Sequence, residues 1–125
     1  MLREIALPDS ALSRVRRSIA WLRQHHAQPV LVGELANLAA MSPATFHRHF
    51  KAVTAMSPIQ FQKQIRLLRA RQLLACGTPT ASDVAYHVGY ESPSQFSRDY
   101  ARCFGASPMR DAHLMRERLR AQVKA

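Results

Sequence analysis

The sequence predicts an all-α fold of seven helices, and three observations lead to this prediction. The dipeptide Ser-Pro occurs four times, at residues 42–43, 57–58, 92–93 and 107–108. Serine at the N-cap followed by proline at the first helical position is a strong helix start. Between these starts, apolar residues recur at intervals of three and four, which is the period of a helix. No stretch alternates apolar and polar residues for more than a few positions, as a half-buried strand would.

Two helices precede the first Ser-Pro pair. Apolar residues at intervals of three and four, beginning at Leu12, predict a first helix from about Asp9 to His26. A short second helix follows Pro29. It has no capping side chain, because Leu31 stands at its start.

The four Ser-Pro pairs begin the third, fourth, sixth and seventh helices. Two of the serines have a glutamine three residues later, Ser57 with Gln60 and Ser92 with Gln95, which is the spacing of a capping box. A weaker signal of the same kind, Thr80 with an aspartate three residues later, starts the fifth helix.

One pattern occurs twice in the chain. The stretches "VGELANLAAMSPATFHRHFK" and "ASDVAYHVGYESPSQFSRDYA" share a short helix, a tight turn and a Ser-capped second helix, which is the layout of a helix-turn-helix. They align at an offset of 49 through Leu35 and Val84, and at 50 from Ser42 and Ser92, so Glu91 is one extra residue in the second turn. The second helix of such a motif can enter the major groove of DNA.

Packing assigns one face of each second helix to the core and leaves the other free for DNA. Phe46 and Phe50 form the buried face of the first copy, as Phe96 and Tyr100 do in the second. The exposed faces have no acidic residue, and they include arginine, glutamine and small hydroxyls, which hydrogen-bond base edges or phosphates. The plain alternative is that the arginines are solvated surface charges. The residues expected to contact DNA are Ser42, Ala44, Thr45, His47, Arg48 and Lys51 in the first copy, and Ser92, Ser94, Gln95, Ser97, Arg98 and Arg102 in the second.

The long fourth helix suggests how the two copies work together. A helix from Pro58 to Cys76 measures roughly 28 Å at 1.5 Å per residue, which suits two readers about one DNA turn, roughly 34 Å, apart. We therefore expect a linker that places the two second helices in successive major grooves. Because the two readers differ, the expected site is asymmetric.

Charge favours a nucleic-acid partner. Eighteen Lys and Arg against eight Asp and Glu give a net charge of +10, and fifteen of the eighteen are Arg. Such a chain is attracted to polyanions, and arginine adds bidentate hydrogen bonding to phosphate and guanine. The hydrophobic content of 47% indicates a folded domain, not a disordered basic tail. Charge alone would equally suit a non-specific nucleic-acid-binding or architectural protein, which is the alternative function.

Enzymatic and metal-binding functions find no support in the sequence. No Ser-His-Asp set or pair of carboxylates is apparent, and no cofactor is expected. His47 and His49 diverge on a helix and lack further ligands, so no metal site is expected. Cys76 and Cys103 are interpreted as reduced core thiols of a cytosolic protein. No apolar stretch reaches membrane-spanning length, and no membrane partner is expected.

Two basic segments outside the repeats have open interpretations. Arg66 on the long helix is expected to pair with an acid such as Asp83 or Glu34, or to be solvated, with a phosphate contact as the alternative. The basic tail that ends at Lys124 is either a solvated helix end or a sequence-independent clamp on DNA.

The stretches "FHRHFKAVTAMSPIQFQKQIRLLRARQLL" and "VAYHVGYESPSQFSRDYARCFGASP" resemble the AraC/XylS family of bacterial transcription regulators. The family pattern Gly-aromatic-x-Ser-x-Ser-x-Phe-x-Arg is met from Gly89 to Arg98, and the resemblance covers about residues 10–110. It implies a homeodomain-like fold, double-stranded DNA as the partner, RNA polymerase as a candidate second partner, and a place at the nucleoid of the bacterial cytoplasm.

The resemblance also implies a domain organisation. The most similar branch has an N-terminal cupin-like domain that senses an effector, so this chain would be the DNA-binding end of a longer protein. The expected parts are a linker remnant at residues 1–8, a first helix-turn-helix subdomain at 9–56, the linker helix at 57–77, and a second subdomain with a basic C-terminal helix at 78–125.

Two positions depart from the family pattern. Ala55 stands where members often have glycine in a left-handed conformation, which costs alanine up to about 1 kcal/mol, so the local turn is expected to differ. Asp111 stands where the family has an aromatic residue followed by arginine. Ser107 and Arg110 are then the expected DNA contacts of the last helix.

Overall fold

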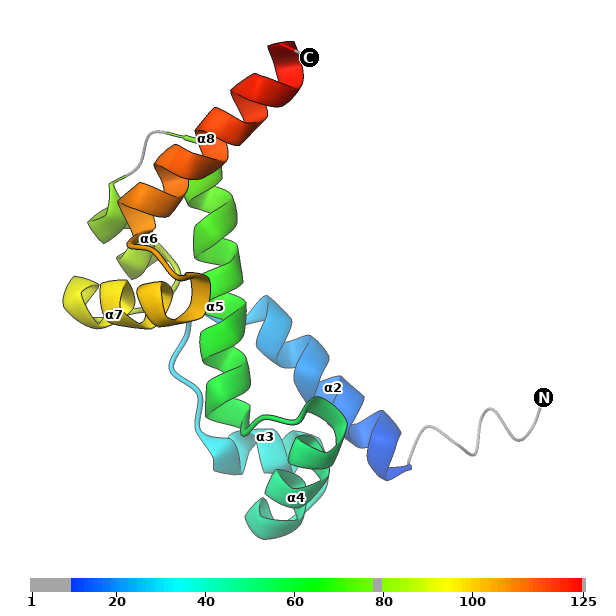
Figure 1. Cartoon of the computed structure of the whole chain (residues 1–125). Coiled ribbons are helices and arrows are strands. Elements are labelled where there is room, and N and C mark those ends of the chain that lie inside the picture. Colours follow the sequence, from blue (N-terminus) through cyan, green and yellow to red (C-terminus); the bar gives the residue numbers. More distant parts are fainter. Residues whose placement is uncertain (1–9, 78–79, 125) are drawn as a thin grey trace. The chain divides into compact units, whose positions relative to one another are not determined.

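The computed structural model describes residues 10–77 and 80–124, which form seven helices and no strand (Figure 1). The predicted all-α fold is therefore confirmed over this part of the chain. The predicted linker remnant, residues 1–8, lies outside the described residues. The helices are α2 (Ala11–Gln24), α3 (Val32–Leu38), α4 (Pro43–Thr54), α5 (Pro58–Ala75), α6 (Ala81–His87), α7 (Pro93–Phe104) and α8 (Pro108–Lys124).

The chain divides into two compact units, Met1–Ile65 and Arg66–Ala125. The first unit contains α2, α3, α4 and the beginning of α5. Gln62 of α5 donates hydrogen bonds to the main-chain carbonyls of His26 (3.2 Å) and Gln28 (2.9 Å), and so ties α5 to the turn after α2. The core of this unit consists of buried apolar side chains: Val15, Leu22, Leu35, Ala36, Ala39, Phe46 and Phe50.

The second unit contains the rest of α5 with α6, α7 and α8. Its helix-turn-helix repeats the packing of the first unit, because Ala36 and Ala85 are fully buried at equivalent positions of α3 and α6. The small alanine side chain allows the two helices of each motif to approach closely. The core of the second unit is formed by Leu67, Ala70, Leu74, Val84, Ala85, Val88, Tyr90, Phe96, Tyr100 and Ala112.

Serine and threonine side chains cap the helices where the sequence predicts them. Ser42 accepts a hydrogen bond from the Thr45 amide (3.3 Å), and Thr80 accepts one from the Asp83 amide (3.1 Å). Ser10 caps α2, which therefore begins slightly later than the predicted Asp9. Each cap satisfies one of the amide groups that a helix leaves unpaired at its start.

Only one of the two predicted capping boxes is complete. At the start of α5, the Gln60 amide donates to the Ser57 hydroxyl (3.2 Å) and the Ser57 amide donates to the Gln60 side chain (3.0 Å). At the start of α7, the Gln95 amide donates to Ser92 (3.2 Å), but the Gln95 side chain turns away towards Asp99. The prediction of a full box at Ser92 is wrong, because the Gln95 side chain donates its NH₂ group to Asp99 and its oxygen, the atom that a box would use, accepts from Arg98.

The turns of the two copies have the same backbone conformation. Ala40 and Ala55 of the first copy have φ values of 54° and 63°, and Gly89 and Gly105 of the second copy have φ values of 103° and 82°. All four are left-handed. The expectation that Ala55 would change the local turn is therefore wrong, since the alanine accepts the strained conformation.

The core differs from the sequence pattern at two places. The buried stripe of α2 passes through Val15, Ser18 and Leu22, and Leu12, where the apolar period begins, is 46% exposed. Both cysteines are exposed, not buried in the core. Cys76 follows the last residue of α5. Phe104, the residue after Cys103, packs against the core instead, and its ring centroid lies 4.6 Å from that of Tyr100.

Candidate nucleic-acid interface

The two faces of α4 have opposite characters. Phe46 and Phe50 are fully buried, with their ring centroids 5.5 Å apart. The predicted DNA-contacting residues lie on the remaining surface of the helix and its N-cap. Thr45 among them is half-buried and hydrogen-bonded to Ser42 (3.0 Å), and the others are exposed: Ser42, Ala44, His47, Arg48 and Lys51.

The faces of α7 have the same arrangement. Phe96 and Tyr100 are fully buried, with their ring centroids 5.6 Å apart. Ser97 is half-buried, and the other predicted contact residues are exposed: Ser92, Ser94, Gln95, Arg98 and Arg102. Each helix-turn-helix therefore presents one arginine-bearing helix face to solvent, with Arg48 and Arg98 at equivalent positions.

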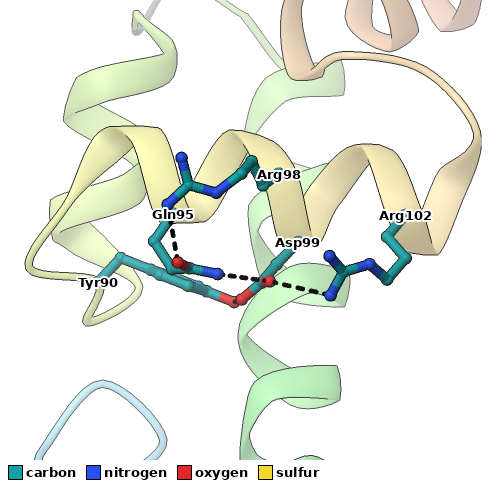
Figure 2. Close-up of polar contacts among 5 residues, drawn as sticks. All are labelled: Tyr90, Gln95, Arg98, Asp99 and Arg102. Carbon is teal, nitrogen blue, oxygen red and sulfur yellow. Dashed lines mark hydrogen bonds and ion pairs between the residues drawn. The ribbon is translucent and has the colours of Figure 1, made fainter.

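A buried carboxylate underlies the exposed face of α7, and the sequence analysis missed it. The side chain of Asp99 is only 2% exposed. It accepts hydrogen bonds from the Tyr90 hydroxyl (3.1 Å) and the Gln95 side-chain amide (2.9 Å), and Arg102 lies 3.9 Å away (Figure 2). A signal for it existed, because Asp99 stands three residues after Phe96 on the stripe that faces the core.

Tyr90 connects this carboxylate to the core. Its ring packs edge-on against Phe96, with 5.3 Å between centroids, while its hydroxyl reaches Asp99. Burial, and then the charge and the hydrogen bond of Asp99, raise the pKa of Tyr90 far above its usual range. Tyr90 therefore remains a neutral hydrogen-bond donor at physiological pH.

The surroundings of Arg66 include an aromatic ring and an acid. Its guanidinium lies over the Tyr90 ring, 6.0 Å from the centroid. Burial lowers the pKa of Arg66, and the nearby Tyr90 and Glu91 partly offset this effect. Glu91, the extra residue of the second turn, is thus an acid whose charge acts on Arg66. The pairing of Arg66 with an acid such as Asp83 or Glu34 stays a prediction.

The start of α8 combines a predicted contact region with an unexpected anchor. Ser107 caps the helix by accepting a hydrogen bond from the Arg110 amide (3.3 Å), and both residues are exposed. Asp111 is buried instead. It accepts hydrogen bonds from the Tyr100 hydroxyl (2.5 Å) and from Arg71 Nε (3.1 Å), so it ties α8 to α7 and α5 within the second unit.

The basic C-terminal helix also has a structural contact. Arg116 donates hydrogen bonds to the main-chain carbonyls of Leu74 (3.2 Å) and Gly77, where α5 ends. A cation at the C-terminal end of a helix hydrogen-bonds the last carbonyl groups and interacts favourably with the helix dipole. Arg116 is therefore engaged within the second unit and is not a free surface charge.

Residues 10–77 and 80–124 contain no group of three or more His, Cys, Asp or Glu side chains that could hold a metal ion. Within the same residues, no helix is both long and apolar enough to cross a membrane.

Comparison with known proteins places these two motifs in a family. A family model of a helix-turn-helix domain, of the AraC type, matches residues 35–112, which is well over half of the chain. The chain belongs to the AraC/XylS family. It carries the helix-turn-helix domain of this family of transcription regulators, and the resemblance seen in the sequence is confirmed.

Individual members of the AraC/XylS family agree with this assignment. The HTH-type transcriptional activator RhaS of Escherichia coli is 33% identical over 100 residues, covering 80% of this chain and 36% of RhaS. This chain thus spans about a third of the length of that relative. The DNA-binding domain of AdpA, solved in complex with a target DNA, superposes with a TM-score of 0.78 at 31% identity, covering 83% of this chain and 94% of that one.

A further AraC-type structure supports the fold alone. A transcriptional regulator from Chromobacterium violaceum superposes with a TM-score of 0.76 at 22% identity, covering 82% of this chain and 91% of that chain. Two helix-turn-helix units in one chain are therefore the architecture that this protein shares with its family.

Proposed function

We propose that this AraC/XylS domain recognises a specific, asymmetric DNA site by placing α4 and α7 in two successive major grooves. One observation carries the proposal: both helices bury an aromatic pair and expose a basic face, with Arg48 and Arg98 at equivalent positions. An arginine that projects from a helix in the major groove can read guanine through two hydrogen bonds. The AdpA domain, which was solved with its target DNA, provides the support from a relative.

The proposed contacts divide into two kinds. Side chains in the middle of each helix face, including Arg48, Gln95 and Arg98, read base edges. Serines at the helix starts, Ser42, Ser92 and Ser107, contact phosphates, because a helix N-terminus offers amide groups and a favourable dipole to anions. Arg110 follows Ser107 in the first turn of α8 and adds a charge to this second kind of contact.

The whole protein is proposed to be a regulator with more parts than this chain. RhaS, a transcriptional activator, is about three times as long as the matched region. We therefore assign effector sensing to an N-terminal domain outside this chain. Contact with RNA polymerase, and action at the nucleoid of the bacterial cytoplasm, complete the proposal.

The decisive experiment begins with selection of binding sites from random duplex DNA. Arg48→Ala and Arg98→Ala are then titrated against the selected site and against its single-base variants. Each substitution should weaken specific binding by about 1–3 kcal/mol and relax base preference at its own positions. Those positions should be separate, because two helices read two grooves.

The control for charge is Arg16→Ala, which removes an exposed arginine of α2. It should leave base preference unchanged. Relaxation at the same positions by both reader substitutions would contradict the two-reader arrangement. Equal affinity of the unaltered chain for selected and random DNA would favour the alternative, a non-specific basic or architectural protein.

A further inference from the structure

The geometry points to Asp99 as a positioning residue for DNA reading. We infer that it orients Gln95 and, through Gln95, Arg98, so that α7 approaches DNA with its reading side chains already set. This inference rests on the proposed function, in which Gln95 and Arg98 read bases. It concerns a residue that lies below the contact face and does not itself reach DNA.

A chain of hydrogen bonds leads from Arg98 through Gln95 to the Asp99 carboxylate. Asp99 Oδ1 accepts from Gln95 Nε2 at 2.9 Å, and Gln95 Oε1 accepts from Arg98 Nη2 at 2.9 Å (Figure 2). Asp99 Oδ2 accepts from the Tyr90 hydroxyl at 3.1 Å. Tyr90, which packs in the core, thus anchors the carboxylate, and the carboxylate holds the exposed Gln95 side chain.

The chemistry of these groups fixes the orientation of the Gln95 amide. An ionised carboxylate only accepts hydrogen bonds, so the amide must turn its NH₂ group to Asp99. The amide oxygen then faces Arg98, whose guanidinium only donates. Each side chain that is ordered before binding avoids an entropy loss when DNA arrives, which is the benefit of preorganisation.

The first copy cannot form this network with its own residues. The positions equivalent to Tyr90, Gln95 and Asp99 are occupied by Met41, Thr45 and His49. A methionine offers no hydroxyl to a carboxylate, and the Thr45 hydroxyl is hydrogen-bonded to Ser42 at 3.0 Å. The anchor therefore belongs to α7 alone, and its loss should affect only the bases that α7 reads.

The test compares Asp99→Ala with Asp99→Asn on a site selected from random DNA. Alanine removes both acceptors. Asparagine keeps one acceptor for Gln95 and can donate to the Tyr90 hydroxyl, and it changes the charge by the same amount. Preference at the positions assigned to Arg98 should fall about tenfold in Asp99→Ala and should stay within about threefold in Asp99→Asn. Preference at the positions assigned to Arg48 should be unchanged in both.

A double-mutant cycle separates positioning from general loss of structure. If Asp99 acts through Arg98, then Asp99→Ala should cause no further loss of preference at the positions assigned to Arg98 in an Arg98→Ala background. Loss at positions that Gln95 itself reads would agree with the inference, because Asp99 also holds Gln95. An additional tenfold loss at the positions assigned to Arg98 in that background, or equal loss at the bases read by α4, would overturn the inference. His49→Ala, at the equivalent position of the first copy, is the matched control and should leave preference at the bases read by α7 unchanged.

Two further outcomes keep the inference distinct from the proposed function. If Arg98→Ala itself leaves base preference intact, the proposed reading role fails, independently of Asp99. If Asp99→Ala does not fold by circular dichroism, Tyr90→Phe replaces it, because this change removes one hydrogen bond and retains the ring packed on Phe96. Tyr90→Phe should relax preference about threefold at the positions of Arg98, and unchanged preference would overturn the inference.

Discussion

Single residues show how far the two copies have diverged in their turns. Ala55 and Gly105 end α4 and α7 at equivalent positions, and each donates its amide to a carbonyl four residues earlier at 2.8 Å. Alanine pays a steric cost in the left-handed conformation that glycine does not. The same contrast holds between Ala40 and Gly89. The first copy thus has strain at both turns where the second has none.

Ala55→Gly should therefore stabilise the protein. The left-handed conformation costs an alanine roughly 1–2 kcal/mol, and glycine loses about 0.5–1 kcal/mol more conformational entropy on folding. We expect the free energy of unfolding to rise by up to about 1 kcal/mol, measured by urea denaturation. Ala52→Gly, in the right-handed last turn of the same helix, is the control and should lower it by up to about 1 kcal/mol. A fall in both variants would mean that Ala55 is not strained.

Among the helices, the clearest difference is between the starts of α5 and α7. Ser57 has a reciprocal partner in Gln60, whereas Ser92 only accepts, because Gln95 is held by Asp99. The start of α7 thus gives up part of its cap to a network of residues that we propose to read DNA.

Ser92→Ala should lower the free energy of unfolding by about 1 kcal/mol, since it removes the acceptor for the Gln95 amide. Ser57→Ala should lower it by at least as much, because it disrupts a complete box. Thermal melting measures both effects. Ser92→Ala should also weaken DNA binding where Ser57→Ala does not, if the Ser92 hydroxyl touches a phosphate. Unchanged melting of Ser92→Ala would show that this cap contributes no stability.

The helices were predictable from the sequence because their signals are local. A serine, a proline and an apolar period lie within a few residues, so they predict the starts of α4, α5, α7 and α8. The position of Asp99 on the core stripe of α7 indicates burial, but its hydrogen-bond partners could not be predicted in this way. Its partner Tyr90 is nine residues away and is brought to it by packing. Cys103 is likewise exposed because its neighbour Phe104 packs against the core instead, and the amino-acid composition does not predict which of the two is buried.

For the whole chain, DNA affinity has two contributions, one from net charge and one from contacts with specific bases. A net charge of +10 provides affinity for any DNA. The logarithm of this binding constant should fall with the logarithm of the salt concentration, at a slope of about −0.9 per phosphate contact. Base contacts release few counterions. A specific site should therefore keep an advantage of about 10³ or more at physiological salt.

The distance between the two reading positions on the DNA should affect only sequence-specific binding. Inserting about five base pairs between the two reading positions turns one groove by half a helical turn away from its reader. An unbroken helix of 18 residues, such as α5, resists twisting by half a turn. Specific binding should fall to the level of random DNA in an electrophoretic mobility assay, while the salt-sensitive part persists. If the altered site binds as tightly as the original, only one of the two helix-turn-helix motifs reads DNA.

The left-handed alanines also have a consequence for how this sequence can change over generations. Every alanine codon becomes a glycine codon by replacement of its second base, so Ala40 and Ala55 are each a single nucleotide away from the residue that the second copy uses. Most new substitutions destabilise a protein, and lineages tolerate them only while stability remains above a threshold. Ala40→Gly and Ala55→Gly are therefore two single-nucleotide changes in the first copy that could offset a loss of stability. They widen the range of recognition-helix sequences, and hence of DNA sites, that this domain can explore without unfolding.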